Sequence, residues 1–447
     1  MSDLFSMAAR VLLVLVLANS TSTYAQTHVI LTNFGSTPND TGRITDIDLA
    51  SGAVNWAMSA LSPPLEAWVP YHAPVISSDG RLAVWMAGQI LRRFLIPGGF
   101  VARDLVSGEI LRGSLPTGFA RDFVGHPRRF VVFAATVAGL FIIEPSGFRK
   151  IPVCEAPEDM SITLDGSELF VACEAGRVVI VDTQREAITR EIAVAPTHSW
   201  SLIEVNGDGS RLVTLGNLSP SEFSLAVHDG HTGQLVAQGS VPTPPACCTH
   251  AAFGSLTTNA DRTEIYAGFL FNDFTNVEAG ETRIYGLDTL TMLGTIPIPL
   301  SSVAFTPDGR KAVAIANWES GELCSALLVD AQKRAVEGSV YSGACGYFPG
   351  VAIAAPPLAP ANLSVTRNNR RVTLGWELPA HSPAATTYLI EVSFQSGGPI
   401  VASLATGSSQ TTLTVDDVPV GTYYVRLRAI NAVGSSAPSP EQEVVIQ

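Results

Sequence analysis

The chain has 447 residues, of which 46% are hydrophobic and only 15% are charged. This composition excludes a disordered acidic chain and provides enough apolar residues for more than one packed core. The formal net charge of −13 disfavours attraction to nucleic acid or to an anionic membrane surface. We therefore expect no nucleic-acid partner.

The first 25 residues are typical of a secretory signal peptide. Arg10 precedes the apolar run at residues 11–18, and a polar stretch then leads to Ala25. The apolar run is far shorter than the ~20 residues that a spanning helix needs. A short apolar run followed by a small residue predicts cleavage, here after Ala25, although an uncleaved anchor is the alternative. We expect a secreted mature chain, extracellular or periplasmic, with no membrane span.

A repeat of roughly 40–50 residues occupies the middle of the chain. In each copy, an acidic residue and a short polar turn separate two alternating apolar segments. The acidic positions are Asp48, Asp104, Glu144, Asp182, Asp229, Asp288 and Asp330. Asp-Gly pairs at 79–80, 165–166, 208–209 and 308–309 lie between further apolar segments and predict hairpins. Four short antiparallel strands per copy are typical of a β-propeller blade.

The ends of the repeat region predict a closed ring of seven blades. Residues 28–58 supply three strands and residues 350–354 supply one, so both ends complete the seventh blade. An open β-solenoid is the alternative. The segments TLDGSELFVACEAGRVVIVDTQREAITREIAV and FTPDGRKAVAIA resemble the seven-bladed propellers of the YVTN-repeat and lactonase-like group. This resemblance covers residues 27–355 and implies an architecture rather than an activity.

A second domain is expected after the proline-rich segment AAPPLAPA at residues 354–361. The following residues alternate with period two. Trp376 and Tyr423 match the core tryptophan and the tyrosine corner of fibronectin type III domains, which this segment resembles. We therefore expect an all-β chain. It would have a signal peptide at 1–25, a seven-bladed propeller at 26–355, a linker at 356–361 and a fibronectin type III β-sandwich at 362–447.

One face of the predicted propeller collects long loops with aromatic and histidine residues. They are Trp68, Tyr71, His72, His198, Trp200, His250, Trp318 and Tyr347. Such a face suggests binding to an extracellular protein or glycan. The alternatives are aromatic residues that plug the ring and histidines capped within loops. We expect no metal or other cofactor, although His72, His198 and His250 could surround the axis.

Four acidic residues near the third complete copy have two interpretations. Glu155, Glu158, Asp159 and Glu174 either hold a cation or form a solvated charged rim. The rim is the simpler interpretation, because clustered surface carboxylates are usually hydrated.

Six cysteines in an exported chain predict disulfides. Cys154, in the loop that enters the third complete copy, and Cys173, at the end of that copy's second strand, lie on one face and can bond. Cys324 begins the third strand of the last complete copy and Cys345 follows its fourth strand on the same face, so they can bond likewise. Cys247 and Cys248 then remain for each other, unless one of them bonds across the face to Cys154 or Cys345. A vicinal disulfide, together with DLASGAVNW at residues 48–56, resembles features of quinone-dependent propeller dehydrogenases. Those enzymes repeat the tryptophan, whereas only Trp56 matches.

The sequence favours a secreted, monomeric, non-catalytic binding or scaffold protein. The alternative is an enzyme, lactonase- or lyase-like or a quinoprotein, with its site in the central funnel. The motifs Gly-x-Ser-x-Gly, Gly-x-x-x-x-Gly-Lys and His-Glu-x-x-His are absent, so no catalytic residue is named.

Overall fold

The computed structural model describes residues 26–33, 43–59, 68–70, 73–91, 94–114, 120–144, 146–155, 157–194, 202–219, 222–242, 250–272, 277–316, 323–344 and 350–447. These residues form β-strands and one short 3-10 turn, η1 (Glu174–Gly176), which confirms the all-β prediction. Within these ranges no helix is long and apolar enough to cross a membrane.

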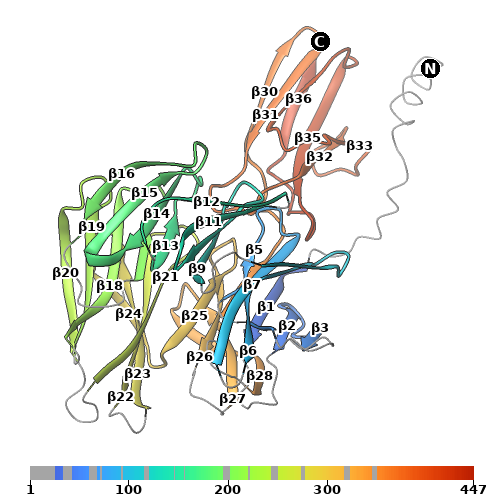
Figure 1. Ribbon diagram of the computed structural model, residues 1–447. Helices are drawn as coiled ribbons and strands as arrows, with labels where there is room; N and C mark the ends of the chain where they lie inside the picture. Colours follow the sequence, from blue (N-terminus) through green and yellow to red (C-terminus); the bar gives the residue numbers. More distant parts are fainter. Residues whose placement is uncertain are drawn as a thin grey trace.

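Between residues 28 and 354, the described strands form seven antiparallel sheets (Figure 1). From the innermost strand outwards, the first two sheets are β29 (Gly350–Ala354), β1 (His28–Asn33), β2 (Arg43–Asp48) and β3 (Val54–Ser59), and then β4 (Trp68–Pro70) with β5 (Val75–Ile76), β6 (Leu82–Leu91), β7 (Phe94–Asp104) and β8 (Ile110–Ser114). The third and fourth sheets are β9 (Ala120–Gly125), β10 (Val132–Thr136), β11 (Gly139–Glu144) and β12 (Gly147–Ile151), and then β13 (Asp159–Ile162), β14 (Glu168–Cys173), β15 (Arg177–Asp182) and β16 (Ala187–Ala193). The last three sheets are β17 (Leu202–Val205), β18 (Arg211–Ser219), β19 (Glu222–Asp229) and β20 (Leu235–Pro242); β21 (His250–Thr258), β22 (Glu264–Asn272), β23 (Val277–Gly286) and β24 (Met292–Ile296); and β25 (Leu300–Phe305), β26 (Lys311–Ala316), β27 (Leu323–Asp330) and β28 (Ala335–Ala344).

The innermost strands contact one another in a closed cycle. The order is β5, β9, β13, β17, β21, β25, β29 and again β5. Strand β29 also pairs with β1, with His28 opposite Ala354 and Thr32 opposite Gly350. The two ends of this region therefore share one sheet, and this is the pairing that the sequence predicts.

The core lies between neighbouring sheets. Strands in the middle of a sheet pack on both faces, so their residues read as continuous apolar runs rather than as alternating ones. In β15, residues 178–181 are all buried, and Phe170 of the adjacent β14 is fully buried against the next sheet. Burying such a side chain stabilises the fold by roughly 1.5–3 kcal/mol. The outermost strands are mostly exposed, as in β12.

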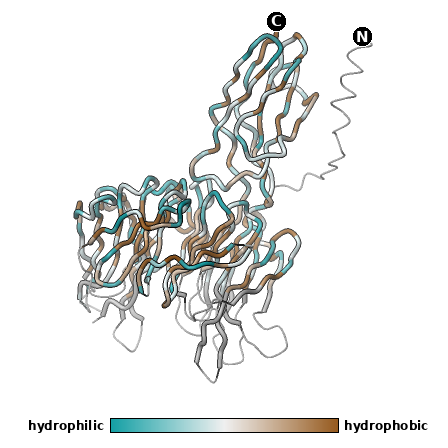
Figure 2. The backbone as a smooth tube through the Cα atoms, turned by 45° about the horizontal axis from the view of Figure 1, so that its top comes forward, coloured by the Kyte–Doolittle hydropathy of each residue, from teal (hydrophilic) through white to brown (hydrophobic). Residues whose placement is uncertain are grey.

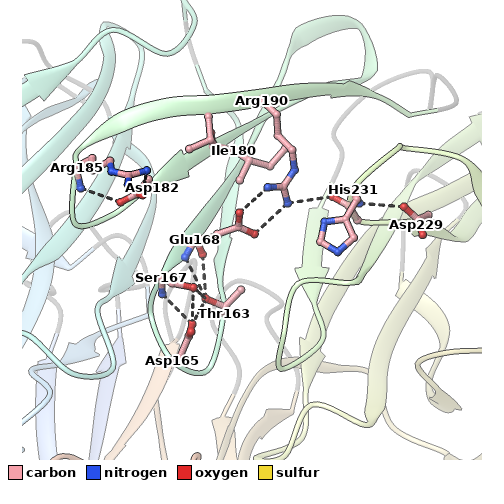
Figure 3. A network of polar contacts seen from close by, with 12 residues as sticks. Thr163, Asp165, Ser167, Glu168, Ile180, Asp182, Arg185, Arg190, Asp229 and His231 are labelled. Carbon is pink, nitrogen blue, oxygen red and sulfur yellow. Dashed lines mark hydrogen bonds and ion pairs between the residues drawn. The ribbon is translucent and has the colours of Figure 1, made fainter.

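Asp residues fix many of the turns that recur along the chain, and Figure 3 shows one set of them. In the turn after β13, the Asp165 carboxylate accepts hydrogen bonds from the Thr163 hydroxyl at 2.7 Å and from the Ser167 N–H at 2.9 Å. Gly166 follows with a φ of +78°, which suits glycine. Asp182, at the end of β15, accepts the N–H groups of residues 184 and 185. These side-chain bonds explain why the repeat places Asp at the turns.

An ion pair near these turns lies within one sheet, and its arginine also donates a hydrogen bond to the next sheet. Arg190 of β16 forms a bidentate contact with Glu168 of β14, and its Nη2 donates to the carbonyl of Gly230 in the next sheet at 3.4 Å (Figure 3).

Residues 361–446 form two packed sheets, termed the C-terminal sandwich. One contains β30 (Ala361–Asn368), β31 (Arg371–Glu377) and β34 (Thr412–Val415); the other contains β33 (Ala402–Ala405), β32 (Thr387–Ser393), β35 (Gly421–Ile430) and β36 (Gln442–Ile446). Trp376 is buried between them and meets Tyr388 edge-to-face, with ring centroids 5.0 Å apart. The Tyr423 hydroxyl donates to the Pro419 carbonyl at 2.9 Å.

The C-terminal sandwich stands on one side of the ring of sheets (Figures 1 and 2). Figure 2 also shows that the turns at this side of the ring are mostly hydrophilic, whereas the strands carry most of the apolar residues. The segment between the two parts is packed rather than free, since Pro357 and Pro360 are buried. Strand β30 begins at Ala361, one residue before the start expected from the sequence.

Candidate functional site

The predicted binding face lies largely outside the described residues. Tyr71, His72, His198, Trp200, Trp318 and Tyr347 fall outside them, as do the side chains of Trp68 and His250, which lie in β4 and β21. The possible site formed by His72, His198 and His250 is outside them for the same reason. The binding role of this face therefore remains a prediction.

One of the predicted disulfides is present. Cys154 and Cys173 are bonded, with their Cα atoms 6.3 Å apart. This confirms the expectation that Cys154, in the segment that enters this sheet, and Cys173, at the end of β14, come together on one face. Cys247, Cys248 and Cys345 and the side chain of Cys324 lie outside the described residues, so their pairing stays a prediction.

A group of polar side chains links the innermost strands of three consecutive sheets to the inner turn of a fourth. We term it the inner-strand cluster; its members are Asp122 of β9, Asp159 and Ser161 of β13, Glu204 of β17, and Arg262. Asp122 accepts hydrogen bonds from Phe123 N at 2.7 Å and from Met160 N, on the neighbouring strand, at 2.9 Å. Asp159 repeats the pattern one sheet further on and accepts Ile203 N at 2.6 Å. Carboxylates here satisfy N–H groups that the inner edge of a sheet leaves without a strand partner.

The two aspartates also interact with each other. Each carboxyl group influences the titration of the other: Asp159 is one of the groups that lower the pKa of Asp122, and the charge of Asp122 raises that of Asp159. Burial raises the pKa of Asp122 to about 6. The pKa of Asp159 is raised well above its ordinary value, first by burial and then by the negative charge of Asp122. The pair therefore holds a proton at pH values where exposed aspartates do not.

Arg262 provides the positive charge of the inner-strand cluster. Its Nη1 donates to the Ser161 hydroxyl at 3.4 Å and to the Val205 carbonyl at 3.2 Å. Ser161 in turn donates to the Glu204 carboxylate at 2.8 Å. Burial raises the pKa of Glu204, and Arg262 opposes that rise. Arg262 thus compensates part of the negative charge that three carboxyl groups place at the centre of the ring.

The structure corrects the interpretation of the four acidic residues near Cys154. They do not act as one patch: Glu155 and Glu174 are exposed, whereas Asp159 belongs to the inner-strand cluster. Glu158 lies 3.7 Å from Arg121 in an ion pair. The solvated-rim interpretation is therefore wrong for Asp159, because the innermost strands of neighbouring sheets enclose it. Across the described ranges, no group of three or more His, Cys, Asp or Glu side chains could hold a metal ion.

Sequence reasoning did not identify the roles of Asp122, Glu204 and Arg262. For Arg262 a signal existed, because Asp261-Arg262 stands where other copies have Asp-Gly, and Arg262 has a φ of +57° that favours glycine. For Asp122 and Glu204 the signal was a carboxylate within a short, otherwise apolar strand, as in ARDFVG at 120–125.

A cavity of about 250 Å³ lies on the side of the ring that faces the C-terminal sandwich. Its walls come from turns that follow the innermost strands of several sheets, and include Ile76, Leu164, Ala260 and Phe305. Residues 380–383 of the C-terminal sandwich line it as well. Because the contributing turns come from sheets all around the ring, the cavity lies at the centre of this face.

No known family model matches the chain. Among solved structures, it is similar to hydrazine synthase from Kuenenia stuttgartiensis, with 14% identity over 59% of this chain and 77% of that one and a TM-score of 0.45. It is similar to the β-propeller domain of Cps50 (Swd1) from Myceliophteria thermophila, with 12% identity, 65% and 93% coverage and a TM-score of 0.44. It is also similar to the WD40 domain of Neurospora crassa Pan2, with 13% identity, 70% and 87% coverage and a TM-score of 0.42. Similarities this weak carry no inference about what the protein does.

Proposed function

We propose that residues 26–355 form a seven-bladed β-propeller and that residues 362–447 form a fibronectin type III domain. The cyclic contacts of the innermost strands support the first assignment, together with the sheet that β29 and β1 share. The second is supported by the three-plus-four arrangement of strands, by buried Trp376 and by the Tyr423 hydroxyl bonded to the Pro419 carbonyl.

The function that this arrangement supports best is that of a secreted, non-catalytic binding protein. The observation that carries the proposal is the position of the C-terminal sandwich, whose residues 380–383 lie over the centre of one face of the ring. An external partner would then approach the centre from the opposite face. We propose that Trp68 of β4 and the predicted loop residues Trp200 and Trp318 belong to that face. Large aromatic residues there would suit an extracellular protein or glycan.

A glycan microarray probed with the labelled full-length chain tests the glycan branch of the proposal. A matching array of extracellular-matrix proteins tests the protein branch. Trp200→Ala and Trp318→Ala should each reduce binding to a positive spot by about tenfold or more, which is the usual effect of removing an aromatic anchor. Phe148→Ala is the control, because Phe148 is an exposed aromatic on outer strand β12. Equal binding by all three variants, or no binding to either array, would contradict the proposal.

A second candidate function follows from the Asp122–Asp159 pair. Two neighbouring buried carboxyl groups whose pKa values are both raised can act as acid and base in hydrolysis. Both groups, however, already accept backbone N–H bonds, so a structural role accounts for their placement.

Assays with aryl esters, lactones and aryl glycosides separate the two roles. A hydrolase would lose activity by roughly 100-fold or more in Asp122→Asn and Asp159→Asn. A wild-type chain inactive on all three substrate classes would rule this candidate out.

A further inference from the structure

Two loops at one end of the C-terminal sandwich bind to turns of the ring. The backbone N–H of Ala384 donates to the Ser78 carbonyl at 2.9 Å, and that of Ala432 donates to the Asp79 carbonyl at 3.2 Å. Both acceptors belong to the turn between β5 and β6. Backbone-to-backbone bonds between the two parts fix their relative position more closely than contacts between long side chains would.

Arg128 secures the first loop, residues 380–384. Its Nη2 donates to the Ala380 carbonyl at 2.6 Å and its Nη1 donates to the Ser382 carbonyl at 3.5 Å. Arg128 lies in the turn that follows β9, in which His126 Nδ1 accepts two backbone N–H groups. Burial, together with nearby Arg129, lowers the pKa of His126 to about 4, so this turn keeps its neutral acceptor at physiological pH.

Asn431 secures the second loop, residues 431–434. Its Oδ1 accepts the N–H groups of Val433 at 2.9 Å and of Gly434 at 3.1 Å, which sets the shape of the loop. Its Nδ2 donates to the carbonyl of Ala355 at 3.0 Å, directly after the last strand of the ring. Asn431 is buried, so this amide would be left unsatisfied if the two parts separated without water replacing Ala355.

The linker and a glycine complete the contact. Leu358 N donates to the Ser382 hydroxyl at 2.8 Å, so the linker packs directly beneath the first loop. Gly80 approaches the second loop so closely that an added Cβ would lie 2.5 Å from Cγ2 of Val433. The fit at Gly80 therefore leaves no room for even a methyl group.

We propose that the C-terminal sandwich is a built-in plug, with residues 380–383 closing the centre of the ring on the turn side. The cavity of about 250 Å³ is the space left under this plug, and its wall includes Ile353 of β29. The two parts behave as one rigid body, and the centre of the ring is accessible only from the opposite face. This inference does not depend on what that opposite face binds.

Gly80→Ala tests the plug, and Gly309→Ala is its matched control. Both glycines follow an Asp in equivalent turns, with φ of +73° and +67°, so alanine strains both backbones equally. At Gly309, however, the nearest atom to an added Cβ is Cβ of Ala260 at 3.7 Å, an ordinary contact. Only the Gly80 substitution pushes against the C-terminal sandwich.

Two measurements on the full chain report whether the C-terminal sandwich has separated from the ring. One is the rate of proteolysis within residues 355–361; the other is maleimide labelling of Ile353→Cys, quantified by peptide mass spectrometry. Gly80→Ala should raise both rates by about tenfold or more, whereas Gly309→Ala should leave them within about twofold of the parent chain. Adding Val433→Ala to Gly80→Ala removes the clashing methyl group and should restore both rates. The proposal is overturned if Gly80→Ala changes neither rate, if both glycine variants change them equally, or if Val433→Ala gives no rescue.

Discussion

Asp122 accepts the backbone N–H of Met160 and Asp159 accepts that of Ile203, so each carboxyl group binds the innermost strand of the next sheet. The same two side chains thus bind three consecutive sheets together, and burial raises the pKa of both. This double role makes the pair sensitive to pH.

The first prediction concerns the pH dependence of stability. The folded-state pKa of Asp122, about 6, lies above its ordinary value of 3.8, so the folded state binds more protons in this interval. The stabilising contribution of Asp122 is therefore complete below pH 3.8 and is lost as the pH rises through about 6. Asp159, whose pKa is also raised, acts in the same direction.

Asp159→Asn removes a buried charge that both desolvation and the charge of Asp122 disfavour, so it should stabilise the chain at pH 8 by about 1 kcal/mol, or roughly 2 °C in Tm. The difference from wild type should vanish at pH 4. Calorimetry at both pH values, with the exposed Glu174→Gln as a control, checks this. A variant less stable than wild type at pH 8 would contradict the proposed pairing.

The second prediction concerns the Cys154–Cys173 disulfide. Its sequence separation of 19 corresponds to a loop-closure contribution of about 3 kcal/mol in the chain-entropy model. Replacing both residues by serine should lower the free energy of unfolding in urea by about that amount. A Cys173→Ser single variant should lose at least as much, because it also leaves Cys154 free. An unchanged urea midpoint in the double variant would show that the bond adds no stability.

The third prediction concerns Trp376. Its side chain is only 4% exposed and its ring packs against Tyr388, so Trp376→Ala should cost about 3–5 kcal/mol. Trp376→Phe keeps the aromatic contact and should cost less. Thermal unfolding followed by tryptophan fluorescence and calorimetry measures both variants. A loss below about 1 kcal/mol in Trp376→Ala would be incompatible with a core position.

The fourth prediction concerns export. If residues 1–25 are a signal peptide, N-terminal sequencing of material collected outside the cytoplasm should begin at Gln26. Placing charged residues in the apolar run at residues 11–18, for example with Leu13→Arg and Leu15→Arg, should keep the chain in the cytoplasm. A secreted chain that still begins at Met1 would contradict cleavage at this site.

Local patterns in the sequence predicted the strands well because the physics that forms them is local. HVILTN, at residues 28–33, and GVAIA, at 350–354, were expected as partners and are paired as β1 and β29. The Asp-Gly turns were equally predictable from the sequence, because the Asp side chain forms hydrogen bonds with groups only two residues away. The Cys154–Cys173 disulfide was predicted in the same way, from the antiparallel arrangement of neighbouring strands.

The inner-strand cluster could not be predicted in this way, because its contacts join different sheets. Nothing local to Glu204 indicates that Arg262, from the next sheet, will lie beside it. The packing of the linker could not be predicted from the sequence either. Its prolines indicated stiffness, but the burial of Pro357 depends on parts of the chain far along the sequence.

The sheet shared by β1 and β29 also has a consequence for how the protein folds. The hydroxyl of Thr32 donates to the carbonyl of Gly350, a residue 318 positions away in the sequence. Contacts of such high separation slow folding, because a long loop must close before the contact is made. Until residues 350–354 are available, β1 presents an unpaired edge, which is where strands of other chains can add. The ring is therefore completed last at the strand that begins it, and a chain truncated before Gly350 would be a species prone to aggregation.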